Sequence, residues 1–325
     1  VNTTFEGKPA RRETSTMPGS AGSSWYFLRY IDPHNNDEFA NKKLLEHWLP
    51  VDLYMGGPEH AVGHLLYSRF WNNYLYNKGL VPVKEPFAKL RHQGMILGSN
   101  GEKMSKSKGN VINPDDMVKE YGADSLRIYE MFMGPIDAAK PWDPNGIDGS
   151  KKFLERVWRL YVESGKIQDK ENHNLERIYH YTVKKVTNDY ESMNFNTAIS
   201  QMMIFVNTVY KEDIFPKEYA EGFLKLLNPV APHITEELWS TCLNHNNTIS
   251  YEAWPTYDES KTISDEITLP IQFNGKLKAT IQILVDEDEK SIKEKVHNAI
   301  DSKLDGKTIV KEIYVKNKIY NIVVK

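Results

Sequence analysis

A strand that runs through two glycines into a helix is the feature that most limits what this chain can fold into. Val51–Met55 is a short apolar run, Gly56-Gly57-Pro58 follows it, and a helix is predicted from about Glu59 to Tyr76. A second strand is predicted near Phe87–Ile96. Strand, helix and strand in this order predict a right-handed βαβ unit with parallel strands. Glycines at the end of such a strand let the backbone come close to a nucleotide.

The predicted helix has an apolar face and a polar start. The apolar face is predicted from the spacing of Leu65, Leu66, Phe70 and Leu75. Glu59, His60 and His64 lie together at the start, and the two histidines share a face because they are four residues apart. The zinc-protease pattern needs Glu directly after the first His, and Ala61 stands there. We therefore predict polar contacts with a substrate, with a packed or capping histidine pair as the alternative.

A lysine-rich loop follows the second predicted strand. Three of the ten residues in Gly101–Asn110 are lysines, and Met104 is the one apolar residue. Like charges repel and glycines cost ordering entropy, so we expect that the loop does not fold stably on itself. The lysines, the hydroxyls of Ser105 and Ser107 and the loop amides suit phosphate oxygens at the carboxyl edge of the sheet. A solvated basic loop is the alternative.

Two stretches flank this unit. Residues 1–24 are rich in Thr, Ser, Gly and Pro and are predicted to be irregular. In Ser23–Tyr30, small residues precede aromatic ones, which suits either a buried helix or strand or the wall of an apolar pocket. After the loop, Asn113 and Pro114 predict a helix start, Gly122 a helix end, and Pro135–Gly149 a loop.

The rest of the chain separates into a helical part and a small α+β part. Amphipathic helices are predicted around Phe153–Leu160 and over Ile178–Tyr190, Ala198–Tyr210 and Phe223–Asn228. Together they predict a helix bundle whose aromatic residues form its core. Beyond Pro255, strands, one helix from about Glu287 to Ile300 and two more strands predict the order ββαββ, with Asn274-Gly275 as a hairpin turn. Lysines near its turns suit edge protection or a weak RNA-backbone patch.

Composition is that of a globular protein without disulfides. The chain has 325 residues, of which 40% are hydrophobic and 26% are charged, and a formal net charge of -3. No run approaches the roughly 18 apolar residues that a membrane span needs, and no secretory leader opens the chain. The single cysteine, Cys242, excludes a disulfide framework and suits a reducing cytosol. Because the first residue is Val1, we expect a piece of a longer protein.

Several stretches carry a resemblance to a known family. Lys103-Met104-Ser105-Lys106-Ser107 matches the KMSKS loop of class I aminoacyl-tRNA synthetases. Within that class the whole chain resembles the C-terminal part of bacterial leucyl-tRNA synthetases. This resemblance rests on Thr16–Tyr26, Tyr54–Tyr67, Gln93-Gly94-Met95, Tyr121–Asp124 and Leu227–His233. The last of these is similar to a segment shared by the leucine, isoleucine, valine and methionine enzymes.

The resemblance implies a multidomain α/β plus all-α fold that consists of three domains. Residues 1–149 would be the C-terminal half of a Rossmann-type catalytic domain with the KMSKS loop. Residues 150–254 would be the helical anticodon-binding domain, and residues 265–325 a small ββαββ domain that reaches the outer corner of tRNA.

The resemblance also implies roles for individual residues. Lys103 and Lys106 would be catalytic, stabilising the α-phosphate and the departing pyrophosphate. The ATP site would consist of Gly56, Gly57, Glu59, His64, Met95, Lys103, Met104, Ser105, Lys106 and Ser107. The leucine pocket would be formed by Ser24, Phe27 and His60, with no protein-bound metal. The implied activity is leucine–tRNA ligase, which uses ATP with Mg²⁺ to form leucyl-adenylate and charge tRNA(Leu), in the cytoplasm, as a monomer and without a membrane.

Two departures from the family pattern limit that expectation. The His-x-Gly-His motif is missing, because His60-Ala61-Val62-Gly63-His64 has one residue too many and lies in a different motif. The editing domain is missing too, although methylene-scale differences between amino acids discriminate poorly. We therefore expect a fragment that does not charge tRNA alone. The alternatives are an isoleucyl-, valyl- or methionyl-tRNA synthetase fragment, a non-catalytic tRNA-binding or chaperone-like protein, and a nucleotidyltransferase with a similar ATP loop.

Overall fold

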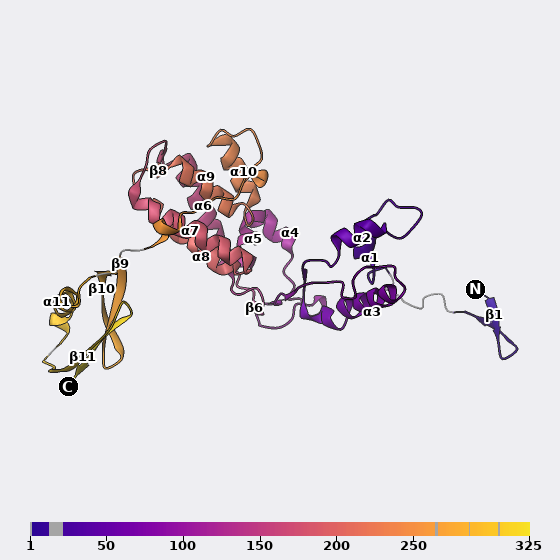
Figure 1. Ribbon diagram of the computed structural model, residues 1–325, viewed down its shortest axis with the longest axis horizontal. Helices are drawn as coiled ribbons and strands as arrows, with labels where there is room; N and C mark the ends of the chain where they lie inside the picture. Colours follow the sequence, from indigo (N-terminus) through magenta and orange to yellow (C-terminus); the bar gives the residue numbers. More distant parts are fainter. Residues whose placement is uncertain (1, 13–21, 264–265, 286, 305) are drawn as a thin grey trace. The chain divides into compact units, whose positions relative to one another are not determined.

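The computed structural model describes residues 2–12, 22–263, 266–285, 287–304 and 306–325 (Figure 1). The chain forms two compact units, one from Val1–Glu155 with Asp189–Ser200 and one from Arg156–Asn188 with Gln201–Lys325. Residues 16–21 of the first stretch that carries the family resemblance lie outside the described residues. The boundaries of the three predicted domains remain predictions.

The N-terminal residues of the first unit form a hairpin, so the prediction of irregular structure over residues 1–24 was wrong for this part. Strands β1 (Asn2–Phe5) and β2 (Lys8–Arg11) pair in antiparallel register. Glu6 has φ 52° and Gly7 has φ 76°, so a two-residue turn with positive φ at both positions joins them. Such a turn matches the twist of a hairpin.

The predicted βαβ unit is confirmed in the first unit. Strand β3 (Tyr54–Gly56) pairs in parallel with β4 (Leu90–His92), and Gly56 is opposite His92. Between them lie a 3-10 turn, η1 (Pro58–Ala61), and helix α3 (His64–Asn77). The strand interaction extends to an isolated parallel bridge between Val51 and Phe87. The short helices α1 (Tyr26–Arg29) and α2 (Lys42–Trp48) precede this unit.

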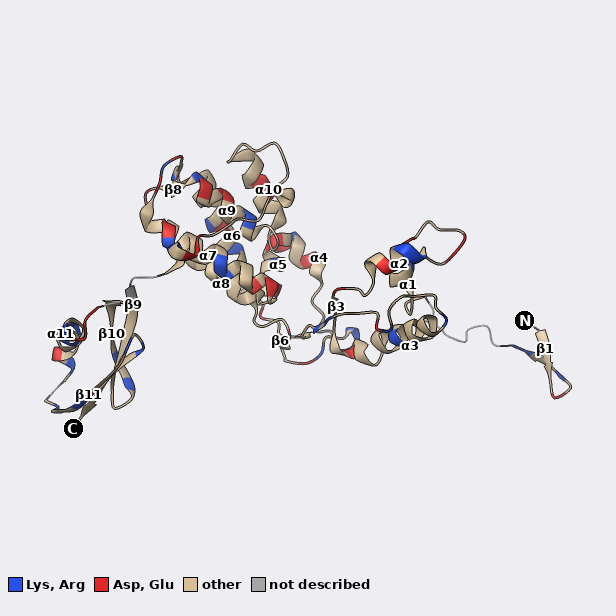
Figure 2. Cartoon of the chain, in the orientation of Figure 1, with Lys and Arg blue, Asp and Glu red and all other residues tan. Residues whose placement is uncertain are grey.

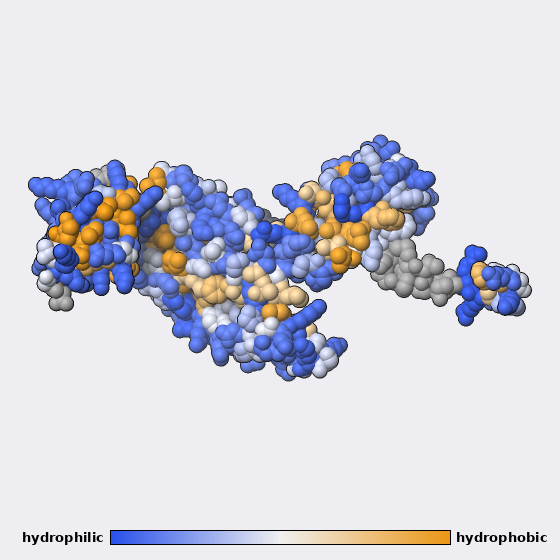
Figure 3. Space-filling view, turned by 90° about the horizontal axis from the view of Figure 1, so that it is seen from below, coloured by the Kyte–Doolittle hydropathy of each residue, from blue (hydrophilic) through white to orange (hydrophobic). Residues whose placement is uncertain are grey.

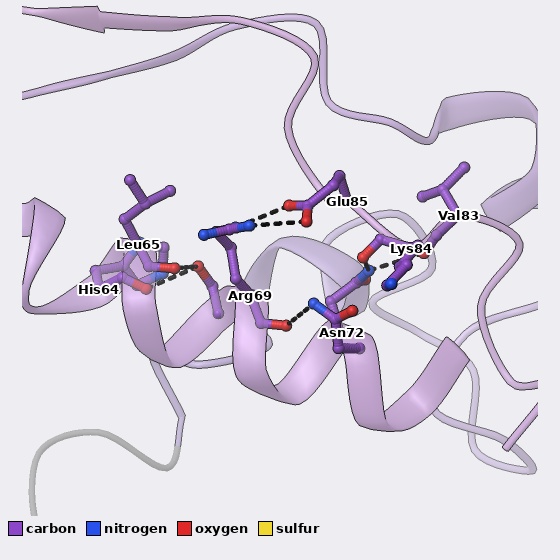
Figure 4. A network of polar contacts seen from close by, with 9 residues as sticks. His64, Leu65, Arg69, Asn72, Val83, Lys84 and Glu85 are labelled. Atoms are coloured by element: carbon purple, nitrogen blue, oxygen red, sulfur yellow. Dashed lines mark hydrogen bonds and ion pairs between the residues drawn. The ribbon is translucent and has the colours of Figure 1, made fainter. Parts of the chain in front are cut away.

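The predicted buried face of α3 was wrong for two of its residues. Leu66 and Phe70 are exposed, and the buried residues of the helix are Ser68 and Asn72. Asn72 donates two hydrogen bonds from Nδ2, to the carbonyl oxygens of Val83 (2.8 Å) and Lys84 (2.9 Å) (Figure 4). The helix therefore packs its polar side on the returning chain, where these amides satisfy backbone oxygens. Hydrophobic residues, drawn in orange, gather on part of the surface of this region of the chain (Figure 3).

The second predicted strand is broken in two. After β4 the chain leaves the strand at Gln93-Gly94-Met95 and re-enters one at β5 (Ile96–Leu97), which pairs in parallel with β6 (Lys140–Pro141). Gly94 accounts for the break, because a Cβ atom there would lie 2.0 Å from the carbonyl oxygen of Ala138. The close approach is fixed by a 2.7 Å hydrogen bond from Gly94 N to the Ile136 carbonyl oxygen.

The next α-helices after the lysine loop are α4, α5 and α6. Helix α4 (Pro114–Tyr121) starts after Asn113, whose Oδ1 accepts from the Asp115 amide, and it ends at Gly122 with φ 89°, as predicted. Helix α5 (Ala123–Phe132) comes next, and α6 spans Gly146–Val162. The predicted loop over Pro135–Gly149 was therefore wrong at both β6 and the first turn of α6. A core cluster contains Leu126, Tyr129, Trp142 and Ile147.

The predicted helices of the bundle are confirmed. The elements are α7 (His173–Glu191), α8 (Phe195–Val209), α9 (Lys217–Leu227) and α10 (Pro232–Thr241), with the short parallel strands β7 (Ile167–Gln168) and β8 (Phe215–Pro216). Phe205, Phe223 and Trp239 are core, as predicted, but the prediction was wrong for Trp158 and Tyr181, which are exposed. Phe205 is 1% exposed, and its ring centroid lies 5.4 Å from that of Phe223.

A segment that we call the α7 strap, Trp254–Thr262, is bonded along α7 in the second unit. Trp254 Nε1 donates to Thr187 Oγ1 (2.8 Å), and the Asp258 amide donates to His180 Nδ1 (3.1 Å). Two ion pairs add to these bonds, Lys184 with Glu259, and Lys261 with Glu176 at 2.6 Å. The α7 partners recur about every four residues and therefore lie on one face of the helix.

The C-terminal module has the predicted order ββαββ. Its elements are β9 (Glu266–Phe273), β10 (Lys276–Leu284), α11 (Glu289–Ile300), the short η5 (Asp301–Lys303), β11 (Ile309–Val315) and β12 (Ile319–Val324). The sheet order is β10-β9-β12-β11, and β9 and β12 are parallel. Asn274 and Gly275 form the predicted hairpin turn with φ 47° and 82°. Helix α11 contributes Ile292, Val296 and Ile300 to the core. No helix among the described residues is both long and apolar enough to cross a membrane.

Candidate active site

A cavity of about 480 Å³ lies at the end of strand β3 in the first unit. It brings together four residues that the sequence predicted for the ATP site or the leucine pocket, namely Phe27, Gly56, His60 and His64. Six further residues line it, and the sequence analysis did not assign them to a site: Tyr26, Val51, Leu53, Tyr54, Met55 and Phe87. Of the predicted pocket residues, Ser24 is fully buried and is not among those lining the cavity.

His64 is held by hydrogen bonds at both ring nitrogens. Its Nε2 lies 2.6 Å from the carbonyl oxygen of Ser23, and its Nδ1 lies 2.9 Å from the hydroxyl of Tyr54. A carbonyl oxygen only accepts, so in the neutral ring Nε2 carries the proton and Tyr54 donates to Nδ1. Burial, and then the neighbouring Tyr26, raise the pKa of Tyr54 above its usual value. The imidazole therefore fixes the turn before α1 to strand β3.

Aromatic rings form the apolar wall of the cavity. The Phe87 ring centroid lies 4.6 Å from that of Tyr54 and 5.2 Å from that of Phe27. Phe27 reaches this wall from α1, Tyr54 from β3, and Phe87 from the segment before β4. A wall of this kind with a few polar groups at its edge is typical of sites for small molecules.

The glycine pair sits where the strand enters η1. A Cβ atom on Gly56 would lie 3.6 Å from Cδ2 of His60, an ordinary contact. A Cβ atom on Gly57 would lie 2.3 Å from Oε2 of Glu59, so the Glu59 carboxylate lies directly against Gly57. Glu59 is exposed and stands in the first turn of η1. Gly56 lines the cavity, whereas Gly57 and Glu59 are not among its lining residues, and the accessible carboxylate of Glu59 follows in η1.

Met95 lies where the chain passes from β4 to β5, and its predicted place in the ATP site stays a prediction. Its side chain is exposed, and its carbonyl oxygen accepts a 3.0 Å hydrogen bond from the Lys140 amide in β6. That carbonyl therefore belongs to the interaction between β5 and β6.

The lysine loop has a defined conformation, contrary to our expectation that it does not fold on itself. Leu97 and Lys103 form an antiparallel bridge, and the Gly98 amide donates to the Glu102 carbonyl oxygen (2.8 Å). The Asn110 side chain accepts from the Ser105 amide (2.9 Å). These bonds outweigh the mutual repulsion of the lysines, which exposure to water already weakens.

The loop side chains point to different surroundings. Met104 packs against the cluster that contains Tyr129 and Trp142. Lys103 and Lys106 are exposed, while Lys108 forms an exposed 2.8 Å ion pair with Glu102. The hydroxyls of Ser105 and Ser107 contact each other at 3.2 Å. The loop therefore presents cations and hydroxyls to solvent over an apolar anchor. Among the described residues, no group of three or more His, Cys, Asp or Glu side chains could hold a metal ion.

Comparison with known families identifies both parts of the chain. Residues 33–142 match the family described as tRNA synthetases class I (I, L, M and V). Residues 172–297 match the family described as anticodon-binding domain of tRNA ligase. The chain carries the catalytic and anticodon-binding domains of class I aminoacyl-tRNA synthetases, and it belongs to that family.

Solved structures narrow the similarity. The chain matches the agnB2 leucyl-tRNA synthetase of Agrobacterium radiobacter K84, solved in a ternary complex with tRNA and LeuAMS, at 35% identity and a TM-score of 0.75. The match covers 100% of this chain and 45% of the synthetase, so the chain spans less than half of that relative.

A second match shows the shared fold. The methionyl-tRNA synthetase of Mycobacterium tuberculosis, solved with methionyl-adenylate, matches at 15% identity and a TM-score of 0.51, covering 67% of this chain and 48% of that one. Within the class, the chain is therefore similar to leucyl-tRNA synthetase.

Proposed function

We propose that this chain is the KMSKS-bearing and tRNA-binding part of a leucine–tRNA ligase. The observation that carries the proposal is the cavity at the end of β3, which joins Phe27, His60 and His64 in a chain that is 35% identical to a leucyl-tRNA synthetase over its full length. The aromatic wall suits an aliphatic side chain such as that of leucine. The alternatives within the class would accept isoleucine, valine or methionine in this cavity.

The proposed reaction is amino-acid activation followed by transfer to tRNA. The leucine carboxylate attacks the α-phosphorus of ATP, the bond to the bridging oxygen breaks, and pyrophosphate leaves with that oxygen. Lys103 and Lys106 stabilise the negative charge on the phosphates, and the carboxylate of Glu59 suits the ribose hydroxyls. Mg²⁺ would arrive with the triphosphate, whose oxygens are its preferred ligands. A hydroxyl of the terminal ribose of tRNA(Leu) then attacks the carbonyl carbon of leucyl-adenylate, the bond from this carbon to the phosphate oxygen breaks, and AMP leaves.

The helical part and the C-terminal module are proposed to bind tRNA. Lys and Arg side chains are mixed with Asp and Glu along the helices of the bundle (Figure 2). With a net charge of -3 for the chain, phosphate contacts must come from local basic groups. We propose residues 1–149 as the catalytic part, residues 150–254 as the helical anticodon-binding domain and residues 265–325 as the small C-terminal domain. We also propose that the protein works as a monomer in the cytoplasm.

Amino-acid activation gives the direct test. In the longer synthetase of which this chain is proposed to be a part, leucine drives ATP–pyrophosphate exchange and isoleucine, valine and methionine do not. Lys106→Ala lowers kcat by about 10²–10³, the usual effect of removing one charge-stabilising group. Exchange driven by another amino acid would replace leucine in the proposal.

The chain by itself has a different expected outcome. We predict no leucyl-adenylate, because the His-x-Gly-His motif that completes the phosphate site in the family is absent from these 325 residues. The measurement is the formation of labelled leucyl-adenylate from ATP and leucine by the purified chain. Detectable adenylate would contradict the division of the catalytic site that we propose.

A further inference from the structure

Asn110 closes the lysine loop from within. Its Oδ1 accepts the 2.9 Å hydrogen bond from the Ser105 amide, and its Nδ2 donates to the carbonyl oxygen of Lys103 at 3.3 Å. One carboxamide therefore binds the backbone on both sides of Met104. The two backbone groups belong to the residues that carry the first lysine and the first hydroxyl of the loop.

Two glycines make this arrangement possible. Gly98 is buried, and a Cβ atom on it would lie 2.9 Å from Asn110 Nδ2 and 2.9 Å from Asn100 Oδ1, so a side chain there would displace these carboxamides. Gly109 has φ 63°, the left-handed conformation that turns the chain back after η2 (Lys106–Lys108). The turn delivers Asn110 to the segment it binds, because glycine adopts positive φ at low cost.

The other contacts of the loop do not replace this carboxamide. The Leu97–Lys103 bridge holds the outgoing arm of the loop to β5. The returning arm is tied by the Lys108–Glu102 ion pair, whose side chains are both about half exposed. Exposed ion pairs contribute little and weaken with salt.

We propose that Asn110 is a positioning residue that fixes the backbone of Lys103–Ser105 and thereby directs the side chain of Lys103 and the turn bearing Lys106. This inference rests on the proposed function only where it concerns ATP. In the absence of ATP, it states how the loop is held, which is measurable without any catalytic activity.

Trypsin cleavage of the loop tests the proposal, because trypsin cuts after lysines in segments that open. In Asn110→Ala, cleavage after Lys103 and Lys106 becomes about tenfold faster than in the unchanged chain, as expected when two hydrogen bonds no longer oppose opening. Asn110→Asp keeps the acceptor for the Ser105 amide and loses the donor to Lys103, so its rate falls between the two.

Asn100→Ala is the matched control. Asn100 stands in the same loop region and bonds only within its own turn, to Glu102. Its loss leaves cleavage after Lys103 and Lys106 unchanged, and circular dichroism confirms that all variants are folded. Equal cleavage rates in Asn110→Ala and the unchanged chain would overturn the proposal.

The addition of ATP with Mg²⁺ separates this inference from the proposed function. If ATP slows cleavage of the unchanged chain and protects Asn110→Ala less, both stand. If ATP protects neither while Asn110→Ala is still cut faster, the positioning role stands and ATP binding by this chain fails. In the longer synthetase, Asn110→Ala lowers kcat of pyrophosphate exchange about tenfold with an unchanged KM for leucine, because it touches the loop and not the cavity. An equal rise in KM for leucine would point to general damage and overturn it.

Discussion

Gly94 shows how one missing side chain shapes the edge of the site. Its backbone lies against Ala138 and Ala139. A Cβ atom on Gly94 would be 2.0 Å from the carbonyl oxygen of Ala138 and 2.7 Å from the amide nitrogen of Ala139. Backbone atoms cannot move aside as the tip of a side chain can. The break between β4 and β5 is therefore specified by this residue.

Gly94→Ala is predicted to destabilise the first unit by about 3 kcal/mol, the upper part of the usual range for overpacking. Urea unfolding measures the loss, with hydrogen exchange of residues 90–97 to localise it. Gly149→Ala is the control, because no atom outside the backbone of its own helix and its two neighbours lies within 4 Å of its Cβ position, and it stands inside α6. It should stabilise by about 0.5–1 kcal/mol, as alanine does in helices. A neutral Gly94→Ala would contradict the close approach.

Tyr54 tests the hold on His64. Tyr54→Phe keeps the ring against Phe87 and removes the hydroxyl bonded to Nδ1. We expect a loss of about 1 kcal/mol in unfolding free energy. We also expect weaker binding of a leucyl-adenylate analogue, measured calorimetrically, because the turn before α1 is held less firmly. Tyr67→Phe, on the exposed side of α3, should change neither quantity.

At the scale of the elements, the binding of the α7 strap to α7 depends on the protonation state of His180. His180 accepts from the Asp258 amide at Nδ1, so the bound strap requires the neutral ring. Burial, and then the charge of Lys261, lower the pKa of His180, against the opposite effects of Glu176, Asp258 and Glu218. A lowered histidine pKa means that the neutral form is favoured when the strap is bound. The interaction is then complete above the ordinary pKa of 6.5 and weakens as the pH falls below it.

The indole N–H signal of Trp254 reports this change by NMR, because that group donates to Thr187 only while the strap is bound. We predict that the signal moves toward its solvent-exposed position as the pH falls below about 6.5. In His180→Gln, a carboxamide oxygen accepts the same amide without titrating, so the shift becomes independent of pH. A strap that stays bound in acid in the unchanged chain would contradict the role of His180.

Turn chemistry decided which elements were predictable from sequence. Asn274-Gly275 and Gly122 were recognised because these residues adopt positive φ readily. The β1–β2 hairpin was missed because Glu6 takes a positive φ that its residue type does not announce. The buried side of α3 was missed because Ser68 and Asn72 pack by hydrogen bonding to backbone, which hydrophobic spacing does not detect.

The cavity could be predicted only in part for a related reason. His60, His64 and the glycine pair could be predicted from their residue types and spacing. Phe87 lies far from them along the sequence and reaches the cavity through the parallel pairing that follows α3. Asn110 belongs to the predicted loop, yet its role depends on the left-handed turn at Gly109. Contacts set by tertiary structure carry no local sequence signal.

At the scale of the whole molecule, the C-terminal module has a hydrophobic core of its own. All nine buried residues of that core come from residues 269–322. We predict that residues 266–325 fold in isolation with a stability of about 3–5 kcal/mol, the range for a single small core. Circular dichroism during thermal unfolding measures this. Gly275→Ala should lower it by about 1 kcal/mol, because its φ of 82° strains an alanine. A non-cooperative melt would show that the module depends on the rest of the chain.

Met104 ties the behaviour of the lysine loop to the helix that leaves the catalytic part. The methionine packs in the same cluster as Ile147, which stands in the first turn of α6. Helix α6 continues to Val162, beyond the end of the first unit at Glu155. A movement of the loop would therefore either pull Met104 out of this cluster or displace the first turn of α6 together with the loop. Methionine is unbranched and polarisable, so among apolar side chains it is the best suited to leaving such a cluster and packing into it again.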